Sequence, residues 1–246
     1  MTNNIFLHIG ARGGSKNVKN KNIIKFLGKP LIAWSLIQGT RLKKEFKKRL
    51  KIIVSSDSNK ILKISKKYGA DLLIKRPKKY SNDFCSKFLV WKHSLKMISS
   101  TYKIQDNDVF LDLDCTCPLR KLNDIKKILG LFEKKKKQKK NFDGLITITE
   151  AKKNPYFNLV ELNKQKYLKI SKKLNKIPVR RQDAPKVYEH VASIYALKPS
   201  FIKKKKNFMS GKLYGLNVDA NSSIDIDSKL DLEILTILKK NLNEKI

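Results

Sequence analysis

The chain has 246 residues, 41% of them hydrophobic, which suits one globular domain with a full core. Its formal charge of +35 comes almost entirely from lysine, in runs such as 134–140 and 203–206, whereas arginine, which favours phosphate forks and base edges, is scarce. Lysine runs are typical of solvated surface. We therefore expect no nucleic-acid partner, although the charge favours anionic small molecules.

The sequence does not resemble that of a membrane protein, a disulfide-rich secreted protein or a zinc-binding protein. No apolar run approaches the roughly 20 residues of a membrane span, and the first residues lack a signal-peptide pattern. The three cysteines, Cys85, Cys115 and Cys117, make no disulfide framework, and their C-x-C has no second Cys or His pair to complete a zinc site. We expect a cytoplasmic protein without a membrane partner.

Strand and helix patterns alternate over the first 150 residues. Apolar runs predict strands at 4–9, 51–56, 70–75, 108–114 and 144–149. Helical spacing predicts helices at 30–40, 59–69, 86–100 and 122–134. Such units form a parallel sheet with helices on both faces, and ligands bind beyond the carboxyl ends of its strands. The loops after the first, second and fourth strands should therefore share one rim.

The alternation ends near residue 150. Residues 154–170 alternate like a β-hairpin with its turn at 163–165, and residues 172–186 form a proline-marked loop. Strands are expected again at 191–198 and 213–219, before a loop and an amphipathic helix. The region near 150–188 therefore interrupts the sheet as an insertion.

The loop after the first strand, "ARGGSKNVKNKN", combines glycines with cations. Gly13 and Gly14 let backbone amides approach a ligand closely, and successive amides in a turn bind anions. Arg12, Lys16 and Lys21 add charge that suits phosphate. Neither the Walker A nor the GxGxxG pattern is present, so the residues alone leave open a phosphate-binding loop and an ordinary basic surface loop.

Two aspartates near the carboxyl end, Asp225 and Asp227, stand in "SIDIDS". In an extended segment, residues two apart project to one side, so both carboxylates can face one cation. Magnesium often takes one or two carboxylates together with phosphate oxygens and water. Composition leaves equally open that one of the two caps the following helix.

Together these motifs resemble the cytidylyltransferases that activate sialic acids and related nine-carbon sugar acids, the CMP-nonulosonate synthetases. The resemblance covers nearly the whole chain in order, through "ARGGSKNVKNKNI", "GKPLIAWSL", "VSSDSNKI", "DLDCTCPLR", "NPYFNLVE", "RRQDAPKVYEHVASIYAL" and "SIDIDSKLDLEI". The "NPYFN" and "RQDAPK" segments are most similar to the legionaminic-acid-activating branch.

This resemblance implies a mostly parallel, Rossmann-like, three-layer α/β nucleotidyltransferase fold in a single domain spanning residues 1–246. It also implies an inserted β-hairpin arm at about 150–188, through which two copies form a homodimer and which helps to enclose the sugar site. The implied reaction joins CTP to the anomeric hydroxyl of a nonulosonate, with legionaminate favoured, and releases pyrophosphate with Mg²⁺ as cofactor. Neuraminate, pseudaminate and 3-deoxy-manno-octulosonate are alternative substrates. A basic nucleic-acid-binding protein would leave the glycine loop and "SIDID" unexplained.

The resemblance also assigns roles. Nucleotide-binding positions are matched by Ala11, Arg12, Gly13, Gly14, Ser15, Lys16, Lys21, Asn22, Arg76, Asp83 and Ser86. Magnesium is assigned to Asp225 and Asp227. Catalysis is assigned to Arg12, Lys16 and Lys21, whose charges neutralise the triphosphate, and to Asp227 as a ligand of the cation. The sugar is assigned to Asp114, Arg181 and Gln182, of which the Arg181 guanidinium suits a forked bond with the C1 carboxylate.

Several of these positions have structural alternatives. Arg76 can be a surface arginine before a turn, Asp83 can cap the next helix, and Arg120 can orient its loop by bonding carbonyls. Asp114 stands where many sialic-acid enzymes have glutamine, and Asp112 is either a site residue or a satisfied carboxylate at a strand end.

The segment "YEHVASIY" departs from the family pattern. Glu189 reverses a charge and Val191 removes an amide, which together point to a differently substituted nonulosonate than N-acetylneuraminate. His190 can act as a base toward the anomeric hydroxyl, but a lone histidine beside a strand is more often packed or solvated.

Overall fold

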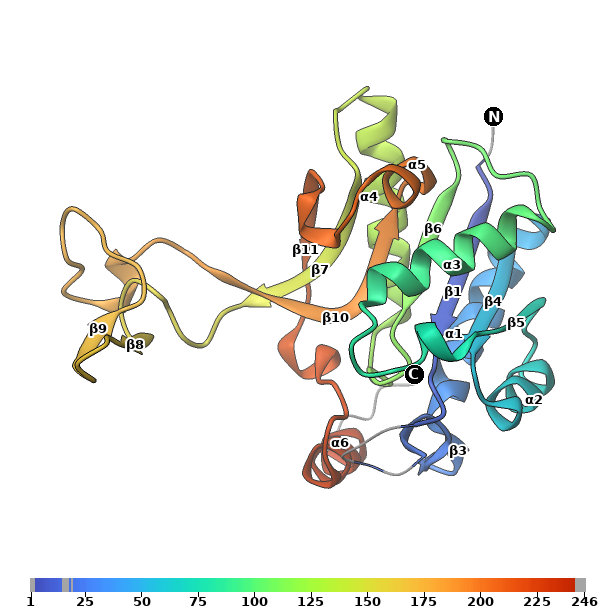
Figure 1. Cartoon of the computed structure of the whole chain (residues 1–246), viewed down its shortest axis with the longest axis horizontal. Coiled ribbons are helices and arrows are strands. Elements are labelled where there is room, and N and C mark those ends of the chain that lie inside the picture. The colour runs from blue at the N-terminus through green and yellow to red at the C-terminus, as the bar shows by residue number, and fades with distance from the viewer. Residues whose placement is uncertain (1–2, 15–17, 19, 242–246) are drawn as a thin grey trace.

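A seven-stranded sheet forms the centre of the protein. The computed structural model describes residues 3–14, 18 and 20–241. The strand order is β11-β7-β10-β6-β1-β4-β5, and among these strands only β10 is antiparallel to its neighbours (Figure 1). The strands are β1 (Ile5–Gly10), β4 (Leu50–Ser56), β5 (Leu72–Lys75), β6 (Val109–Leu113), β7 (Gly144–Glu150), β10 (Tyr188–Leu197) and β11 (Leu213–Asn217). The expected mostly parallel α/β fold is confirmed.

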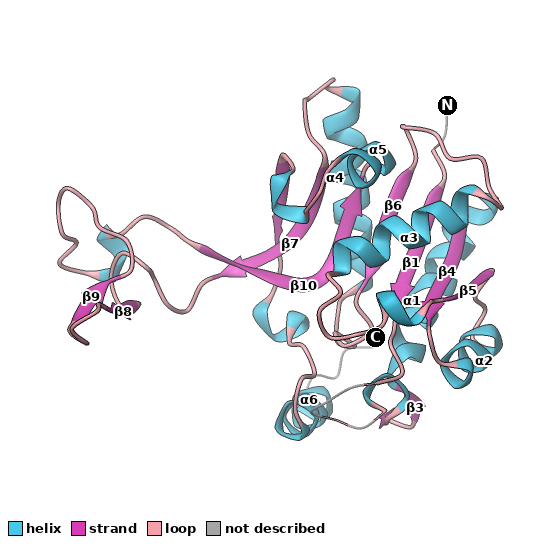
Figure 2. Ribbon diagram, in the orientation of Figure 1, coloured by secondary structure: helices cyan, strands magenta, loops and turns pink. Residues whose placement is uncertain are grey.

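Helices cover both faces of the sheet, as Figure 2 shows. One face carries α1 (Leu31–Phe46), α2 (Asn59–Lys67) and α4 (Leu122–Lys137), whose apolar side chains share one core with β1 and β4. The other face carries α3 (Lys87–Ser99) and α5 (Pro199–Lys204), packed on the aromatic side of the sheet. Because both faces are covered, the inner strands are apolar on both sides.

A third, small apolar cluster closes one end of the sheet. It joins α6 (Lys229–Asn241) to the short pair β2 (Lys25–Phe26) and β3 (Lys29–Pro30), through Phe26, Leu31, Leu119, Ile226 and Leu235. The carboxyl-terminal segment therefore lies beside the loop that follows β1. The 3-10 turns are η1 (Lys21–Ile23), η2 (Lys47–Arg49), η3 (Lys78–Tyr80), η4 (Arg181–Asp183), η5 (Phe208–Ser210) and η6 (Ala220–Ser223).

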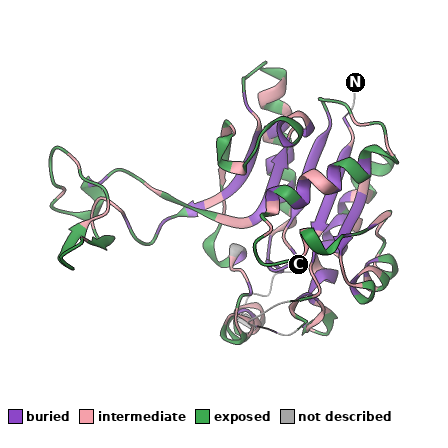
Figure 3. Cartoon of the chain, viewed as in Figure 1, coloured by how far each residue is buried: buried purple, intermediate pink, exposed green. Residues whose placement is uncertain are grey.

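The insertion extends from the body as an arm, residues 151–187, whose stem continues β7 and β10 (Figure 1). At its end, β8 (Val160–Leu162) pairs with β9 (Leu168–Ile170). Figure 3 shows that the arm is mostly exposed whereas the sheet is buried. Its exposed apolar side chains are Leu159, Val160, Leu162, Tyr167, Leu168, Ile177 and Val179.

The expected hairpin is present but shorter than the sequence pattern suggests. Each strand has only three residues, and the segment before β8 turns instead, because the Asn154 side chain accepts a hydrogen bond from the Tyr156 amide. The turn itself is longer than 163–165, since the Asn163 side chain accepts from the amide of Tyr167 at 2.8 Å. Local side-chain bonds thus replace ladder pairing.

Helix α1 is longer than the expected 30–40. It continues to Phe46 through Gly39, where an added Cβ would lie 3.2 Å from Ile52 Cδ1 and 3.3 Å from Leu7 Cδ1. Gly39 therefore serves close packing of the helix on the sheet instead of ending the helix. Ser58 and Ser86 cap α2 and α3, and each side chain accepts a hydrogen bond from the helix backbone.

Candidate active site

A cavity of about 510 Å³ lies beyond the carboxyl ends of β1 and β6. It is built by the loop after β1, the segment between β5 and α3, the end of β6 and the segment before α6. The predicted site residues that line it are Arg12, Lys21, Asn22, Arg76, Asp83, Asp114, Asp225 and Asp227. The expected rim is therefore where the candidate nucleotide and metal residues gather.

Other nucleotide assignments lie around this cavity without lining it. Ala11, Gly13 and Gly14 belong to the same loop, and Ser86 caps α3 by accepting a hydrogen bond from Leu89 N at 3.3 Å. Ser15 and Lys16 lie outside the described residues.

Three candidate anion-binding groups in or beside the cavity are paired with carboxylates of the protein itself. Arg12 Nη1 contacts Asp83 Oδ1. The Gly13 amide donates to Asp57 Oδ1 at 2.8 Å, and Lys21 Nζ lies 2.9 Å from Asp227 Oδ1. Carboxylate oxygens thus occupy positions that phosphate oxygens can take, an arrangement that suits a candidate anion-binding loop.

The loop after β1 is supported from below. Asn22 is buried, and its Nδ2 donates to the Arg12 carbonyl at 2.8 Å while its Oδ1 accepts from Cys115 Sγ at 3.0 Å. Asn22 therefore shapes the loop in this state. Gly10 is closely packed, because a Cβ there would lie 3.2 Å from Arg76 Nη2 and 3.3 Å from His8 Cε1, so a larger residue would require these side chains to shift.

Arg76 is buried, so its interpretation as a surface arginine is wrong. Its Nη2 donates to the Ser55 carbonyl at 2.6 Å and its Nε to Ser55 Oγ at 3.1 Å. Burial lowers the pKa of the guanidinium, which nearby Asp57 partly opposes. Arg76 is thus held at the cavity wall by the end of β4.

The two carboxyl-terminal aspartates do not cap α6. Ser228 and Asp231 do so, since Asp231 Oδ2 accepts from the amides of Asp227 and Ser228 at 2.9 and 2.7 Å. Among the described residues, buried Asp225 Oδ1 has no hydrogen-bond partner, and burial raises the pKa of Asp225. An orphaned carboxylate oxygen beside a second carboxylate fits a divalent cation.

Few possible metal ligands surround Asp225 and Asp227. No group of three or more His, Cys, Asp or Glu residues suited to a metal occurs within the described ranges. Two carboxylates alone suit magnesium, which usually completes its shell with water and substrate phosphates.

The floor of the cavity is an ionic network. Buried Asp112 contacts His8 Nδ1 through one oxygen and lies 2.8 Å from Lys87 Nζ through the other. Lys87 also contacts Asp114 Oδ2. Asp112 is thus a buried, ion-paired carboxylate at a strand end, as one alternative predicted, and it also lines the cavity, as the other predicted.

Arg120 shapes the loop that carries Asp114. It is buried, and its Nη1 donates to the carbonyls of Asp114 at 3.1 Å and Ser193 at 2.8 Å. The structural alternative for Arg120 is therefore confirmed, and its loop is fixed at the edge of the cavity.

The sequence model of the family described as cytidylyltransferase matches residues 8–244 of this chain. The chain belongs to the cytidylyltransferase family. A CMP-N,N'-diacetyllegionaminic acid synthase of Campylobacter jejuni is 40% identical over 98% of both chains. The post-translational flagellin modification protein B of Campylobacter coli is likewise 40% identical over 98% of both chains. A pseudaminic acid cytidylyltransferase of Campylobacter jejuni is 32% identical over 94% of both.

Solved structures support the fold of this cytidylyltransferase. A CMP:2-keto-3-deoxy-manno-octonic acid synthetase in complex with CTP superposes with a TM-score of 0.68 at 15% identity, over 97% of this chain and 99% of the other. A 4-diphosphocytidyl-2C-methyl-D-erythritol synthase from Anaerococcus prevotii gives 0.64 at 16% identity, over 97% and 99%. The nucleotidyltransferase fold expected from the sequence is confirmed.

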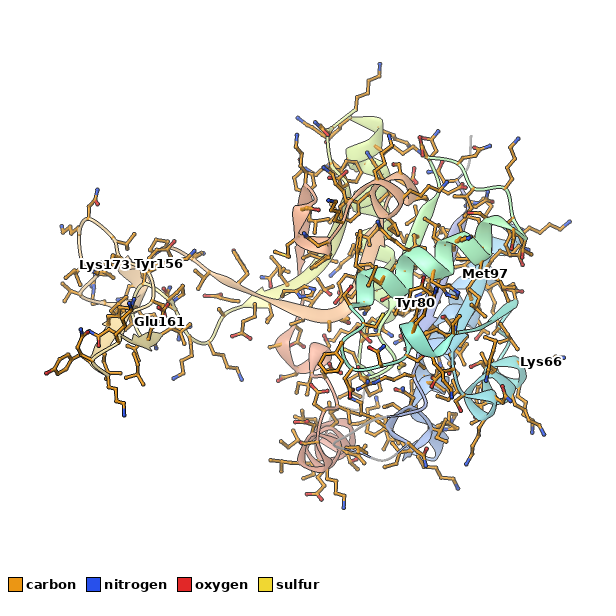
Figure 4. The ribbon with its side chains drawn as sticks, viewed as in Figure 1. Lys66, Tyr80, Met97, Tyr156, Glu161 and Lys173 are labelled. Atoms are coloured by element: carbon orange, nitrogen blue, oxygen red, sulfur yellow. The ribbon has the colours of Figure 1, made fainter. Side chains whose placement is uncertain are left out.

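The cytidylyltransferase does not bring all its predicted sugar residues to this cavity. Arg181 and Gln182 lie in η4 on the arm, where Arg181 Nη2 donates to the Ala151 carbonyl at 2.8 Å. Figure 4 shows Tyr156, Glu161 and Lys173 of the arm well away from Tyr80, which lines the cavity. Within one chain, Asp114 alone of the three sugar assignments lies at the cavity.

Glu189 and His190, which the sequence singled out, lie in β10 at the stem of the arm. Glu189 Oε1 accepts a hydrogen bond from the Lys152 amide at 3.0 Å. The ring of His190 lies 5.3 Å from Phe208 and 5.4 Å from Tyr195, and burial lowers its pKa. His190 does not line the cavity, so its packed alternative describes it better than the role of a base.

The sequence interpretation missed Lys87 and Asp57. The Asp57 carboxylate holds the glycine loop by accepting a hydrogen bond from the Gly13 amide. Lys87 had one local signal: it is the first residue of α3, where a cation is unfavourable beside the positive end of the helix dipole.

Proposed function

We propose that this cytidylyltransferase transfers CMP from CTP to the anomeric hydroxyl of a sialic-acid-like nonulosonate and releases pyrophosphate. The full-length similarity to a legionaminic acid synthase is the observation that carries the substrate class, and it favours a legionaminate-type sugar. The cavity supports the reaction type because it gathers cations and carboxylates at the strand ends of a nucleotidyltransferase fold.

Arg12, Lys21 and the amides of the glycine loop are the proposed triphosphate ligands. Each exchanges its internal carboxylate for a phosphate oxygen when CTP binds, so the cavity contributes charge without large rearrangement. These groups hold the phosphates in line with the attacking hydroxyl and neutralise the negative charge that grows on pyrophosphate. Arg76 and Asn22 keep the loop and wall in place beside the nucleotide.

Asp225 and Asp227 are the proposed magnesium ligands. Bound magnesium would supply positive charge to the phosphate oxygens. The orphaned Oδ1 of Asp225 and the exposed carboxylate of Asp227 fit such an ion. The ion pair between Lys21 and Asp227 would then be broken: Lys21 would bind a phosphate oxygen, and Asp227 would bind the cation.

The arm supports a homodimer. Its apolar side chains have no core within one chain, with Ile177 and Val179 exposed by 82% and 85%. A second copy can cover them and can receive Arg181 and Gln182 beside its own cavity. The sugar acid would then bind in the cavity that Asp114 lines, and its carboxylate would contact Arg181 of the neighbouring chain.

The compartment is proposed to be the cytoplasm, because all three cysteines are free thiols, as suits reducing conditions. Among the described residues, no helix combines the length and apolar character that crossing a bilayer requires.

Pyrophosphate release from CTP and Mg²⁺ in the presence of each candidate sugar acid tests the proposal. The panel contains legionaminate, pseudaminate, N-acetylneuraminate and 3-deoxy-manno-octulosonate, with Lys21→Ala as the inactive control. We expect the highest kcat/KM with a legionaminate-type sugar. Release only with octulosonate, or no release with any of the four, would contradict the proposal.

A further inference from the structure

Lys87 is a cation of the cavity that the proposed function leaves without a role. It begins α3 and lines the cavity, with its side chain 36% exposed. A lysine at the start of a helix is disfavoured by the helix dipole. When a residue breaks such a local rule, a tertiary role is expected to compensate for it.

The ammonium group of Lys87 is anchored on the buried floor. Its Nζ lies 2.8 Å from Asp112 Oδ2, and Asp112 is itself held by His8. It also contacts Asp114 Oδ2 and lies 4.3 Å from the centre of the Tyr195 ring. The aromatic face and the two carboxylates together fix the position of this flexible side chain.

The charges of this cluster are stable near neutral pH. Burial by itself lowers the pKa of Lys87, but Asp112 and Asp114 outweigh it and raise this pKa well above the usual value. For Asp112, burial is likewise outweighed, chiefly by Lys87, so its carboxyl pKa lies far below its usual range. Lys87 with the two carboxylates therefore carries a net charge of about minus one.

One donor and one acceptor remain for a ligand. An ammonium has three N–H donors. Lys87 donates to Asp114 Oδ2 and forms an ion pair with Asp112, so at least one N–H remains for a ligand. Asp114 Oδ2 accepts from Lys87, whereas Oδ1 has no donor among the described residues. The cluster of Lys87, Asp112 and Asp114 is already negative, and Asp225 and Asp227 line the same cavity. Binding of an anionic group of the substrate next to this cluster is therefore unfavourable.

We propose that Lys87 is a positioning residue that holds Asp114 so that the two bind one hydroxyl group of the sugar acid. This inference rests on the proposed function. A hydroxyl is both donor and acceptor, so it can donate to Asp114 Oδ1 while accepting from Lys87 Nζ. The pair thus selects a neutral, hydroxylated part of the sugar, and the sugar carboxylate binds elsewhere.

The test uses Lys87→Met, Asp114→Ala and the double variant, with Lys96→Met as the matched control on the exposed side of α3. Substrates are the nonulosonate that the wild-type enzyme uses best and its monodeoxy analogues, one for each hydroxyl. CTP affinity is measured separately by calorimetry in the absence of sugar. Asp114→Ala keeps the Lys87–Asp112 pair, so it tests the site even if Lys87→Met does not fold.

For wild type, we expect one deoxy analogue to lose at least about tenfold in kcat/KM, as for a hydrogen bond to a charged group. Asp114→Ala and Lys87→Met should raise the KM for the parent sugar by a similar factor and abolish that discrimination. The double variant should be little worse than either single one, and CTP affinity should change less than about threefold.

Two results would overturn the inference: unchanged discrimination in the variants, or a loss confined to CTP affinity. If wild type uses no nonulosonate at all, the proposed function fails first, and the pyrophosphate panel detects this separately.

Discussion

The cavity and the arm differ in how completely one chain satisfies them. In the cavity, Arg12, the Gly13 amide and Lys21 each have a carboxylate partner, and the floor is an ionic network around buried Asp112. On the arm, apolar side chains stand in solvent and β8 pairs only with β9. An isolated two-stranded hairpin is marginally stable in water.

This difference suggests that nucleotide binding and sugar binding depend on different parts of the molecule. The proposed nucleotide half of the site needs only the fold of the body, because its described groups lie in or around the cavity of one chain. The proposed sugar half lacks Arg181 and Gln182 within one chain, because these residues lie on the arm. If both assignments hold, the arm must bring them to the cavity of another copy, and the following experiments test that relation.

The largest expected effects come from Lys21→Ala and Arg181→Ala. Each alone should lower kcat/KM by at least about a hundredfold, since each removes a charge that binds a substrate anion. Mixed under conditions of subunit exchange, they should recover about a quarter of wild-type activity, because half of the dimers are mixed and each holds one intact site. Pyrophosphate release measures this.

Co-purification of differently tagged variants shows whether mixed dimers form. If they form and the mixture recovers no activity, Arg181 and Lys21 of the same chain serve one site, or Arg181 serves no site. Mixing Lys21→Ala with Arg12→Ala provides the control. Both changes lie in the body, so each site of a mixed dimer contains one altered body and neither site is intact. This control mixture should therefore recover no activity.

Disruption of the arm surface comes next. Leu168→Asp and Ile177→Asp place a charge where the side chains are 70% and 82% exposed. We expect light scattering to report half the wild-type mass, with the circular dichroism of the body retained, because burying an unpaired carboxylate at an interface is unfavourable. Lys66→Asp on α2, which Figure 4 shows far from the arm, should leave the mass unchanged. An unchanged mass in both arm variants would contradict an arm-mediated dimer.

A smaller effect is expected from Asp227→Asn. Without magnesium, this change releases Lys21 and should tighten CTP binding by about threefold to tenfold, on the order of 1 kcal/mol for an exposed ion pair. With magnesium, the wild type should gain affinity and the variant should not. Calorimetry with EDTA and with Mg²⁺ measures both, and Asp106→Asn is an exposed control. Weaker binding of CTP to the variant in EDTA would contradict the exchange of partners.

The smallest effect concerns stability and pH. Burial lowers the pKa of His8 below its ordinary value of 6.5, so the folded state keeps this ring neutral while the unfolded state binds a proton below that pH. Stability should therefore fall on acidification below pH 6.5, with this residue contributing up to about 1.4 kcal/mol per pH unit. Denaturant unfolding at pH 7, 6 and 5 measures the slope.

His8→Gln cannot gain that proton, so its stability should depend less steeply on pH over the same interval, even if the variant is less stable at pH 7. Equal slopes for the two proteins would show that His8 does not contribute.

Local sequence patterns were sufficient for the sheet, the helices and the glycine loop. Strand and helix periodicities reflect burial of neighbouring residues, and serine caps such as Ser58 and Ser86 act within one turn, so these features can be predicted from short segments. The family resemblance assigns the triphosphate to the loop after β1 and its magnesium to Asp225 and Asp227, which implies that these segments are close, and Lys21 indeed contacts Asp227.

Only the tertiary structure decided which partners the long or buried side chains have. Lys87 follows an ordinary helix cap in sequence, yet its ammonium group reaches Asp112 and Asp114 because α3 packs across the end of β6. Arg181 stands in a motif similar to that of sugar-binding enzymes, yet the arm carries it away from the cavity. Hydrogen bonds and ion pairs depend on contacts between residues far apart in the chain, and sequence spacing alone does not determine those contacts.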